Sequence, residues 1–226
     1  GVPTELVEGV DPGVREAFDA TLDDLASQGA EITDVELPSV EHAVEAYYVI
    51  AMSEASSNLA RFDGVRYGVP AGGGSEDDGT ESSGVGGFDG NWNDAFASSR
   101  EAGFGDEVKR RILLGTYALS AGYQEEYYEK ARDARAWVKR DFDSALEKAD
   151  VLASPTMPVP PMELGESLED PLTMYLADAN TTPVNLASLP AISVPAGETD
   201  GLPVGAQFVG PAFGEEAIIR VASATE

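Results

Sequence analysis

The excess of acidic side chains is the feature that most limits how this chain folds. Its 226 residues include 41 Asp and Glu but only 14 Lys and Arg, which gives a formal net charge of −27. Charges at this density repel one another in dilute buffer, but in ~1 M salt the Debye length falls to about 3 Å and the repulsion is screened. Because 42% of the residues are hydrophobic, a packed core is still expected. The sequence therefore predicts a salt-adapted globular protein.

The composition also excludes several classes of function. Phosphate backbones and anionic membranes are bound by clustered Lys and Arg, so this chain is not expected to grip nucleic acid or lipid through its own surface. It has no Cys, which rules out disulfides, thiol catalysis and Cys-ligated metals. The one histidine, His42, rules out a multi-His metal site and is expected at the surface. No apolar run approaches the ~18 residues of a membrane span.

The order of periodic segments predicts an α/β fold without internal repeats. The sequence opens Gly1-Val2-Pro3 without an initiator Met, and its last helix has no Gly, Asn or Pro to end it. We therefore expect this chain to be part of a longer polypeptide. A turn at Asp200-Gly201 joins the last two strands. The expected elements are helices over 11–29, 40–61, 105–119, 123–148, 171–179, 181–189 and 214–226, and strands over 32–37, 151–153, 191–195 and 203–209.

Residues 71–87 interrupt this pattern with the sequence AGGGSEDDGTESSGVGG. A glycine-rich loop can cradle phosphate, but here no strand precedes it, no Walker lysine follows it, and the acidic run would repel phosphate. We interpret it as a solvated surface insertion.

The residues themselves reveal no catalytic apparatus. A Ser/His/Asp triad would have to use His42, yet that residue lies in a charged helical stretch and the chain has no G-x-S-x-G elbow. Ser–Lys chemistry needs a desolvated lysine. Each lysine instead lies in a helical segment beside charged residues, at positions 109, 130, 139 and 148.

Two charged positions are unusual. Lys109-Arg110-Arg111 is the one three-residue basic cluster, ahead of an apolar run, and an Arg there is suited to grip a carboxylate through two hydrogen bonds. Asp178 precedes the expected helix start at Thr181 and is suited to hold an ammonium group. Surface salt bridges for the arginines and a helix-end role for Asp178 remain the alternatives. Together an Arg and an Asp would form a clamp for an α-amino acid.

Several long motifs resemble a known family. The chain is similar to the C-terminal half of GatA, the glutaminase subunit of the GatCAB aminoacyl-tRNA amidotransferases, which belongs to the amidase signature family. The resemblance covers nearly the whole chain apart from residues 71–87. The matching motifs are SEASSNLARFDGVRYG (53–68), GDEVKRRILLGTYALSAGYQEEYYEKA (105–131), DPLTMYLADANTTPVNLASLPAISVPAG (170–197) and GLPVGAQFVG (201–210), with GVPTELVEGVDPGV at the start.

The resemblance implies a fold and an activity. The fold is a mixed central β-sheet layered by helices, of which residues 1–226 would form the C-terminal part of one domain. GatA hydrolyses glutamine with a Lys–Ser–Ser triad, and that triad lies in an N-terminal half that is absent here, so no catalytic residue is carried over. The ammonia passes to the partner GatB, which uses ATP and Mg²⁺ on Glu-tRNA(Gln) or Asp-tRNA(Asn) and makes most tRNA contacts. The third partner, GatC, braces the pair, and the complex is expected in the cytoplasm.

The glutamine-binding residues of the family do map onto this chain. Its K-R-R-I segment places the carboxylate-binding Arg at Arg111, and its M-Y-x-x-D segment places the ammonium-binding Asp at Asp178. A Tyr before S-E-A-S-S-N maps best to Tyr47, with Tyr48 as its neighbour. We therefore expect Arg111, Asp178 and Tyr47 to bind glutamine.

Two other functions remain as alternatives. A partner-independent amidase of the same family would act on amides that lack the zwitterion, which the Arg and Asp pair argues against. A non-catalytic binding module would be stable alone, whereas half of a larger fold should expose sheet edges and apolar side chains.

Overall fold

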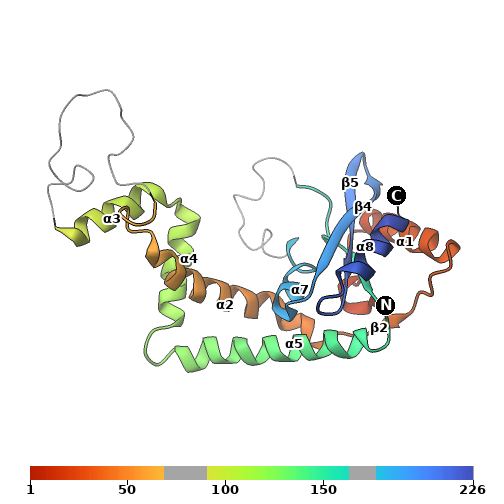
Figure 1. Ribbon diagram of the computed structural model, residues 1–226, viewed down its shortest axis with the longest axis horizontal. Helices are drawn as coiled ribbons and strands as arrows, with labels where there is room; N and C mark the ends of the chain where they lie inside the picture. Colours follow the sequence, from red (N-terminus) through yellow and green to blue (C-terminus); the bar gives the residue numbers. More distant parts are fainter. Residues whose placement is uncertain (69–90, 163–176, 226) are drawn as a thin grey trace. The chain divides into compact units, whose positions relative to one another are not determined.

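The computed structural model describes residues 1–68, 91–162 and 177–225, which form two compact units (Figure 1). Unit 1 comprises Gly1–Tyr47 and Ala131–Glu226, and unit 2 comprises Tyr48–Lys130. The insertion expected over 71–87 and most of the helix expected over 171–179 lie outside the described residues. Within those residues, no helix is both long and apolar enough to span a bilayer.

A three-stranded antiparallel sheet organises unit 1. Its order is β3 (Leu152–Pro155), β5 (Leu202–Val209) and β4 (Ala191–Thr199). Asp200 and Gly201 join β4 to β5 with φ values of 51° and 77°, the left-handed geometry that matches a two-residue turn to the twist of its strands. All three strands and this turn were predicted from the sequence.

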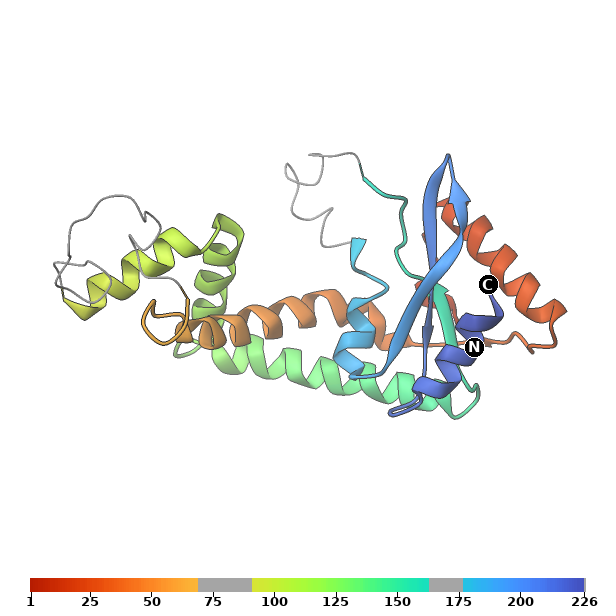
Figure 2. The same cartoon turned by 45° about the horizontal axis from the view of Figure 1, so that its top comes forward.

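Helix α1 (Pro12–Ser27) and helix α8 (Glu215–Ala224) cover one face of this sheet (Figures 1 and 2). The carboxylate of Asp11 accepts hydrogen bonds from the backbone N–H groups of Gly13 and Val14 and so begins α1. The helix expected over 11–29 is confirmed, and the apolar stripe of α1 packs into the core. That core includes Val14, Phe18, Leu22 and Leu25 of α1, Val204, Ala206 and Phe208 of β5, and Ile218 and Ala222 of α8.

A short parallel pair extends unit 1 beyond β3. Strand β1 (Val2–Pro3) pairs with β2 (Asp34–Val35), and the backbone N–H of Ala153 donates to the carbonyl of Gly1 (2.8 Å). The expected strand over 32–37 thus exists, although only its middle is regular. Short 3₁₀ turns follow at Thr4–Leu6 and Pro38–His42.

Helix α7 (Thr182–Ala187) lies on the opposite face of the sheet from α1 (Figure 2). Arg135 of α5 (Lys130–Leu146) ties α7 down, because its Nε donates to the carbonyl of Leu186 and its Nη2 to Oγ of Ser188. The start of α7 at Thr181 was predicted. The side chain of Thr181 does not cap the helix, however, because its hydroxyl donates to the carbonyl of Asp178, three residues earlier.

Unit 2 is helical. It holds most of α2 (Ala43–Asn58), a 3₁₀ turn (Leu59–Arg61), α3 (Trp92–Gly103), α4 (Asp106–Ala118) and a π-helical segment (Gln124–Glu129). A Cβ placed on Gly115 of α4 would collide with the carbonyl oxygen of Met52, so α2 and α4 meet backbone to backbone. The predictions did not include α3, which begins at the N-cap Asn91.

Candidate functional site

Arg111 lies in the middle of α4 in unit 2. Its Nε donates to Oε1 of Glu107, one helical turn earlier, at 2.8 Å. The side chain is 40% exposed. Of the described residues, Glu107 alone accepts a hydrogen bond from the Arg111 guanidinium, so Nη1 and Nη2 remain available to a ligand.

Glu107 is shared between two arginines. Its Oε2 accepts hydrogen bonds from Nε (2.8 Å) and Nη2 (2.6 Å) of Arg110, while its Oε1 accepts from Arg111. Burial raises the pKa of Glu107, but the hydrogen bonds and charges of Arg110 and Arg111 outweigh it and hold the pKa below its ordinary value. The surface salt bridges considered above for this basic cluster are therefore present, and they leave one edge of Arg111 uncommitted.

Asp178 is exposed and lies just before α7 in unit 1. Its carbonyl accepts from the backbone N–H groups of Thr181 (3.1 Å) and Thr182 (2.9 Å), which forms a turn ahead of α7. The alternative role of its carboxylate as a helix-end cap stays a prediction.

A buried polar network fixes the segment that carries Asp178. Nδ2 of Asn180 donates to the carbonyls of Leu6 (3.0 Å) and Pro155 (2.8 Å). Nε2 of Gln207 donates to the carbonyl of Asn180 (3.1 Å) and to Oγ of Ser154 (3.3 Å). Because all these groups are buried, each lost bond would leave an unsatisfied polar atom. Asp178 therefore sits two residues from a rigid anchor on the sheet.

Tyr47 lies on α2 and is partly buried, as is Tyr48. Tyr47 and Asp178 belong to unit 1, whereas Arg111 belongs to unit 2. The assignment of these three residues to one glutamine site stays a prediction.

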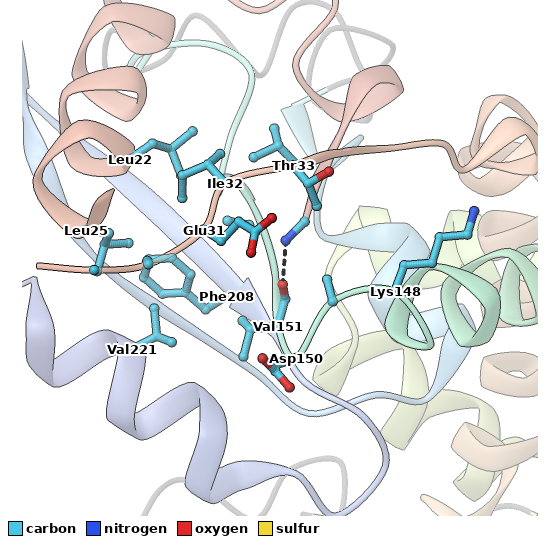
Figure 3. Close-up of a pocket in the computed structure, with 16 residues that line it drawn as sticks. Leu22, Leu25, Glu31, Ile32, Thr33, Lys148, Asp150, Val151, Phe208 and Val221 are labelled. Atoms are coloured by element: carbon cyan, nitrogen blue, oxygen red, sulfur yellow. Dashed lines mark hydrogen bonds between the residues drawn. The ribbon is translucent and has the colours of Figure 1, made fainter. Parts of the chain in front are cut away.

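One pocket, of about 550 Å³, lies in unit 1 beside the C-terminal part of α1 (Figure 3). Leu22, Leu25 and Phe208 give it an apolar wall, and the backbone nitrogen of Gly1 donates to the carbonyl of Val151 (2.8 Å) at its floor. Lys148 directs its ammonium away from that wall. No nucleophile and base converge among its lining residues, so the pocket does not define an active site.

A second pocket, of about 390 Å³, lies where β4 and β5 meet the loop after β3. The hydroxyl oxygens of Thr156 and Ser193 are 2.6 Å apart at its wall. The described residues that line this pocket include no titratable side chain, so none of them can act as a base for either hydroxyl.

Across residues 1–68, 91–162 and 177–225, no group of three His, Cys, Asp or Glu is arranged to hold a metal ion. Sequence reasoning missed three residues that shape the candidate site: Glu107, Asn180 and Gln207. The signal for Glu107 was available, since Glu at i and Arg at i+4 favour pairing on a helix. Asn180 and Gln207 act through long-range contacts, for which the sequence offers no local signal.

Comparison with known proteins identifies the family. The sequence model of the Amidase family matches residues 1–219. The chain belongs to the amidase family, and the predicted α/β fold with amidase architecture is confirmed.

Curated relatives of this chain belong to one kind of protein within the family. The chain is 72% identical to the GatA subunit of Glutamyl-tRNA(Gln) amidotransferase from Haloarcula marismortui, over 99% of this chain and 49% of that protein. It is 66% identical to the corresponding protein of Halobacterium salinarum, over 100% of this chain and 50% of that protein. It is 52% identical to that of Exiguobacterium sibiricum, over 100% of this chain and 44% of that protein. The chain spans about half the length of these relatives. The haloarchaeal sources fit the salt-adapted composition.

Solved structures share the fold of this chain. The crystal structure of the GatA subunit of Glutamyl-tRNA(Gln) amidotransferase from Thermotoga maritima matches all of this chain and 41% of that protein, with a TM-score of 0.70 and 37% identity. An amidase crystal structure matches with a TM-score of 0.69 at 24% identity, which supports the fold alone.

Proposed function

We propose that this chain is the C-terminal half of the glutaminase subunit of a tRNA-dependent amidotransferase. The observation that carries the proposal is the 72% identity to a Glutamyl-tRNA(Gln) amidotransferase GatA along 99% of the chain. The whole subunit would hydrolyse glutamine and supply the ammonia that converts Glu-tRNA(Gln) to Gln-tRNA(Gln). The alternative acceptor is Asp-tRNA(Asn), which the same ammonia would convert to Asn-tRNA(Asn).

In this proposal the chain binds the substrate and does not attack it. Arg111 would hold the α-carboxylate of glutamine, Asp178 would hold the α-ammonium, and Tyr47 would contact the substrate beside them. A clamp on both charges fixes the side-chain amide in front of a nucleophile supplied by the other half of the subunit. The Lys–Ser–Ser triad would lie in that half.

The partners follow from the same proposal. GatB would use ATP and Mg²⁺ to activate the misacylated tRNA and would make most of the tRNA contacts, and GatC would brace the complex. A net charge of −27 fits this division, because an acidic protein is a poor surface for phosphate. A cytoplasmic heterotrimer would place the enzyme beside its tRNA.

Exposed features favour this proposal over a free-standing binding module. Within the described residues, β4 forms an edge of the sheet without a further strand. Leu113, Leu114 and Tyr117 of α4 expose 71%, 43% and 51% of their surfaces. Half of a larger fold is expected to show such edges and side chains.

Replacing Arg111 with Ala in the full-length protein tests the clamp. Loss of a charge-assisted contact is expected to raise KM for glutamine by between about tenfold and a hundredfold. Lys109→Ala removes the same charge from the same helix and should leave KM nearly unchanged. Steady-state glutaminase assays in high salt provide the measurement. Equal KM values for the Arg111→Ala and wild-type enzymes would contradict the assignment of Arg111.

A further inference from the structure

We propose that Glu107 is a positioning residue for glutamine binding: it fixes the guanidinium of Arg111 so that its Nη1–Nη2 edge meets the substrate carboxylate. This inference rests on the proposed function. Glu107 itself would not touch the substrate.

The geometry selects one edge of Arg111. A guanidinium can grip a carboxylate with two parallel bonds either through Nε and one Nη or through both Nη groups. Here Oε1 of Glu107 accepts from Nε at 2.8 Å, so the Nε edge is occupied. The remaining two-pronged edge is the Nη1–Nη2 pair. Because the side chain is 40% exposed, it would otherwise sample many rotamers, and the pairing restricts them before the substrate arrives.

Arg110 holds Glu107 from its other side. It donates to Oε2 of Glu107 through Nε and Nη2, while Arg111 donates to Oε1. Because both carboxylate oxygens of Glu107 are engaged, its side chain is restricted, and so is the guanidinium of Arg111 that is bound to it.

A purely structural role would look different. Glu107 lies in the first turn of α4, where a negative charge favours the helix, and its pairings at i+3 and i+4 add to that. Asp106 lies in the same turn and carries the same charge, yet Arg110 and Arg111 donate to Glu107. Asp106→Asn is therefore a matched control for the effect of Glu107 on the helix alone.

The test uses the full-length protein with its partners, in high salt. Glu107→Ala is expected to raise KM for glutamine by about five- to tenfold, with kcat within about twofold of wild type. Glu107→Gln keeps an oxygen at the Oε1 position and should recover part of this loss. In an Arg111→Ala background, Glu107→Ala should raise KM no further, because the residue through which it acts is gone.

A second substrate provides a readout that helix stability does not affect. L-glutaminamide lacks the α-carboxylate, so the preference of the enzyme for glutamine over glutaminamide measures carboxylate recognition. Glu107→Ala should reduce that preference by about the same factor as it raises KM, whereas Asp106→Asn should leave it unchanged.

The outcomes separate the two proposals. If Arg111→Ala leaves KM unchanged, the proposed clamp fails. If Arg111→Ala raises KM but Glu107→Ala and Glu107→Gln both behave like Asp106→Asn, the role of Glu107 alone is overturned. Additive effects of Glu107→Ala and Arg111→Ala on KM would overturn it as well. Should Glu107→Ala fail to fold, Glu107→Gln carries the same comparison.

Discussion

Asp63 shows how one carboxylate organises a loop at the scale of a single residue. Its Oδ1 accepts hydrogen bonds from the backbone N–H groups of Val65 (3.0 Å) and Arg66 (2.8 Å), and its Oδ2 accepts from Nε of Arg66 (2.9 Å). Only 6% of the Asp63 side chain is exposed. The bonds from Val65 and Arg66 hold the pKa of Asp63 well below its ordinary value.

This lowered pKa makes a prediction about stability and pH. A carboxylate whose pKa is lower in the folded state stabilises that state above the unfolded pKa, here about 4, and the contribution is lost as the pH falls toward the folded pKa. Asp63→Asn should therefore be less stable than wild type near pH 6, and the gap should narrow from about pH 4 downward. Thermal unfolding midpoints of the two proteins, measured from about pH 6 down to about pH 2, test this. A gap that does not change with pH would contradict the role of the charge.

Short-range residue roles were the most predictable from sequence. The helix start at residue 11 and the turn at Asp200-Gly201 were both predicted and confirmed, because each depends on local backbone geometry. The contacts of Asn180 with Leu6 and Pro155 join positions 174 and 25 residues apart, so local patterns do not reveal them.

At the scale of elements, the crossing of α2 and α4 depends on a single glycine. The peptide of Met52 occupies the place that a side chain at residue 115 would need. Arg111 lies one turn before this contact on the same helix. The closeness of the two helices at Gly115 therefore sets how α4 presents that turn within unit 2.

Gly115→Ala should destabilise the protein, although Ala is the better helix former. The added methyl has to push backbone apart, and overpacking of this kind costs about 1–3 kcal/mol. Gly103→Ala is the matched control, because a Cβ at the end of α3 would meet nothing within 4 Å. Chemical unfolding in high salt should show a loss for Gly115→Ala and none for Gly103→Ala. Equal stability of both variants would contradict a backbone contact at Gly115.

Element prediction succeeded where periodicity was strong. The apolar stripe of α1 and the β-branched strands β4 and β5 have a clear period, whereas α2 was recognisable as a long Ala-rich stretch. The prediction omitted α3, even though Asn91 caps it and Trp92 contacts Phe96 one turn later. Its polar composition and its place after the Gly-rich stretch hid that signal. The pairing of β1 with β2 was also unpredictable, since each is only two residues long.

At the scale of the whole molecule, the net charge supports adaptation to salt, and the length relative to known proteins supports a portion of a larger fold. The acidic surface suits concentrated salt, which fits relatives from Haloarcula and Halobacterium. The chain spans about half of those relatives, and β4 offers an open edge within the part that the structure describes. These features favour a portion of a larger amidase fold.

The candidate site was predictable only in part. Charge chemistry singled out the basic cluster at 109–111 and Asp178 as a clamp for an α-amino acid, but the family resemblance was needed to choose Arg111 within the cluster and to add Tyr47. Composition excluded thiol and multi-His metal chemistry, because those need residues that the chain lacks. The spacing of Glu107 and Arg111 allows a helical pair, but many acidic residues of this chain lie three or four positions from a Lys or Arg, so only the structure distinguishes Glu107 from them.

Glutaminase activity in high salt tests the central claim most directly. The assay compares the 226-residue chain with a longer protein in which the residues encoded upstream are joined to it. We predict ammonia release from glutamine by the joined protein and none by the chain alone, because the chain supplies substrate-binding residues and the other half supplies the nucleophile. Activity in the 226-residue chain alone would contradict the account and would place a catalytic nucleophile within these residues.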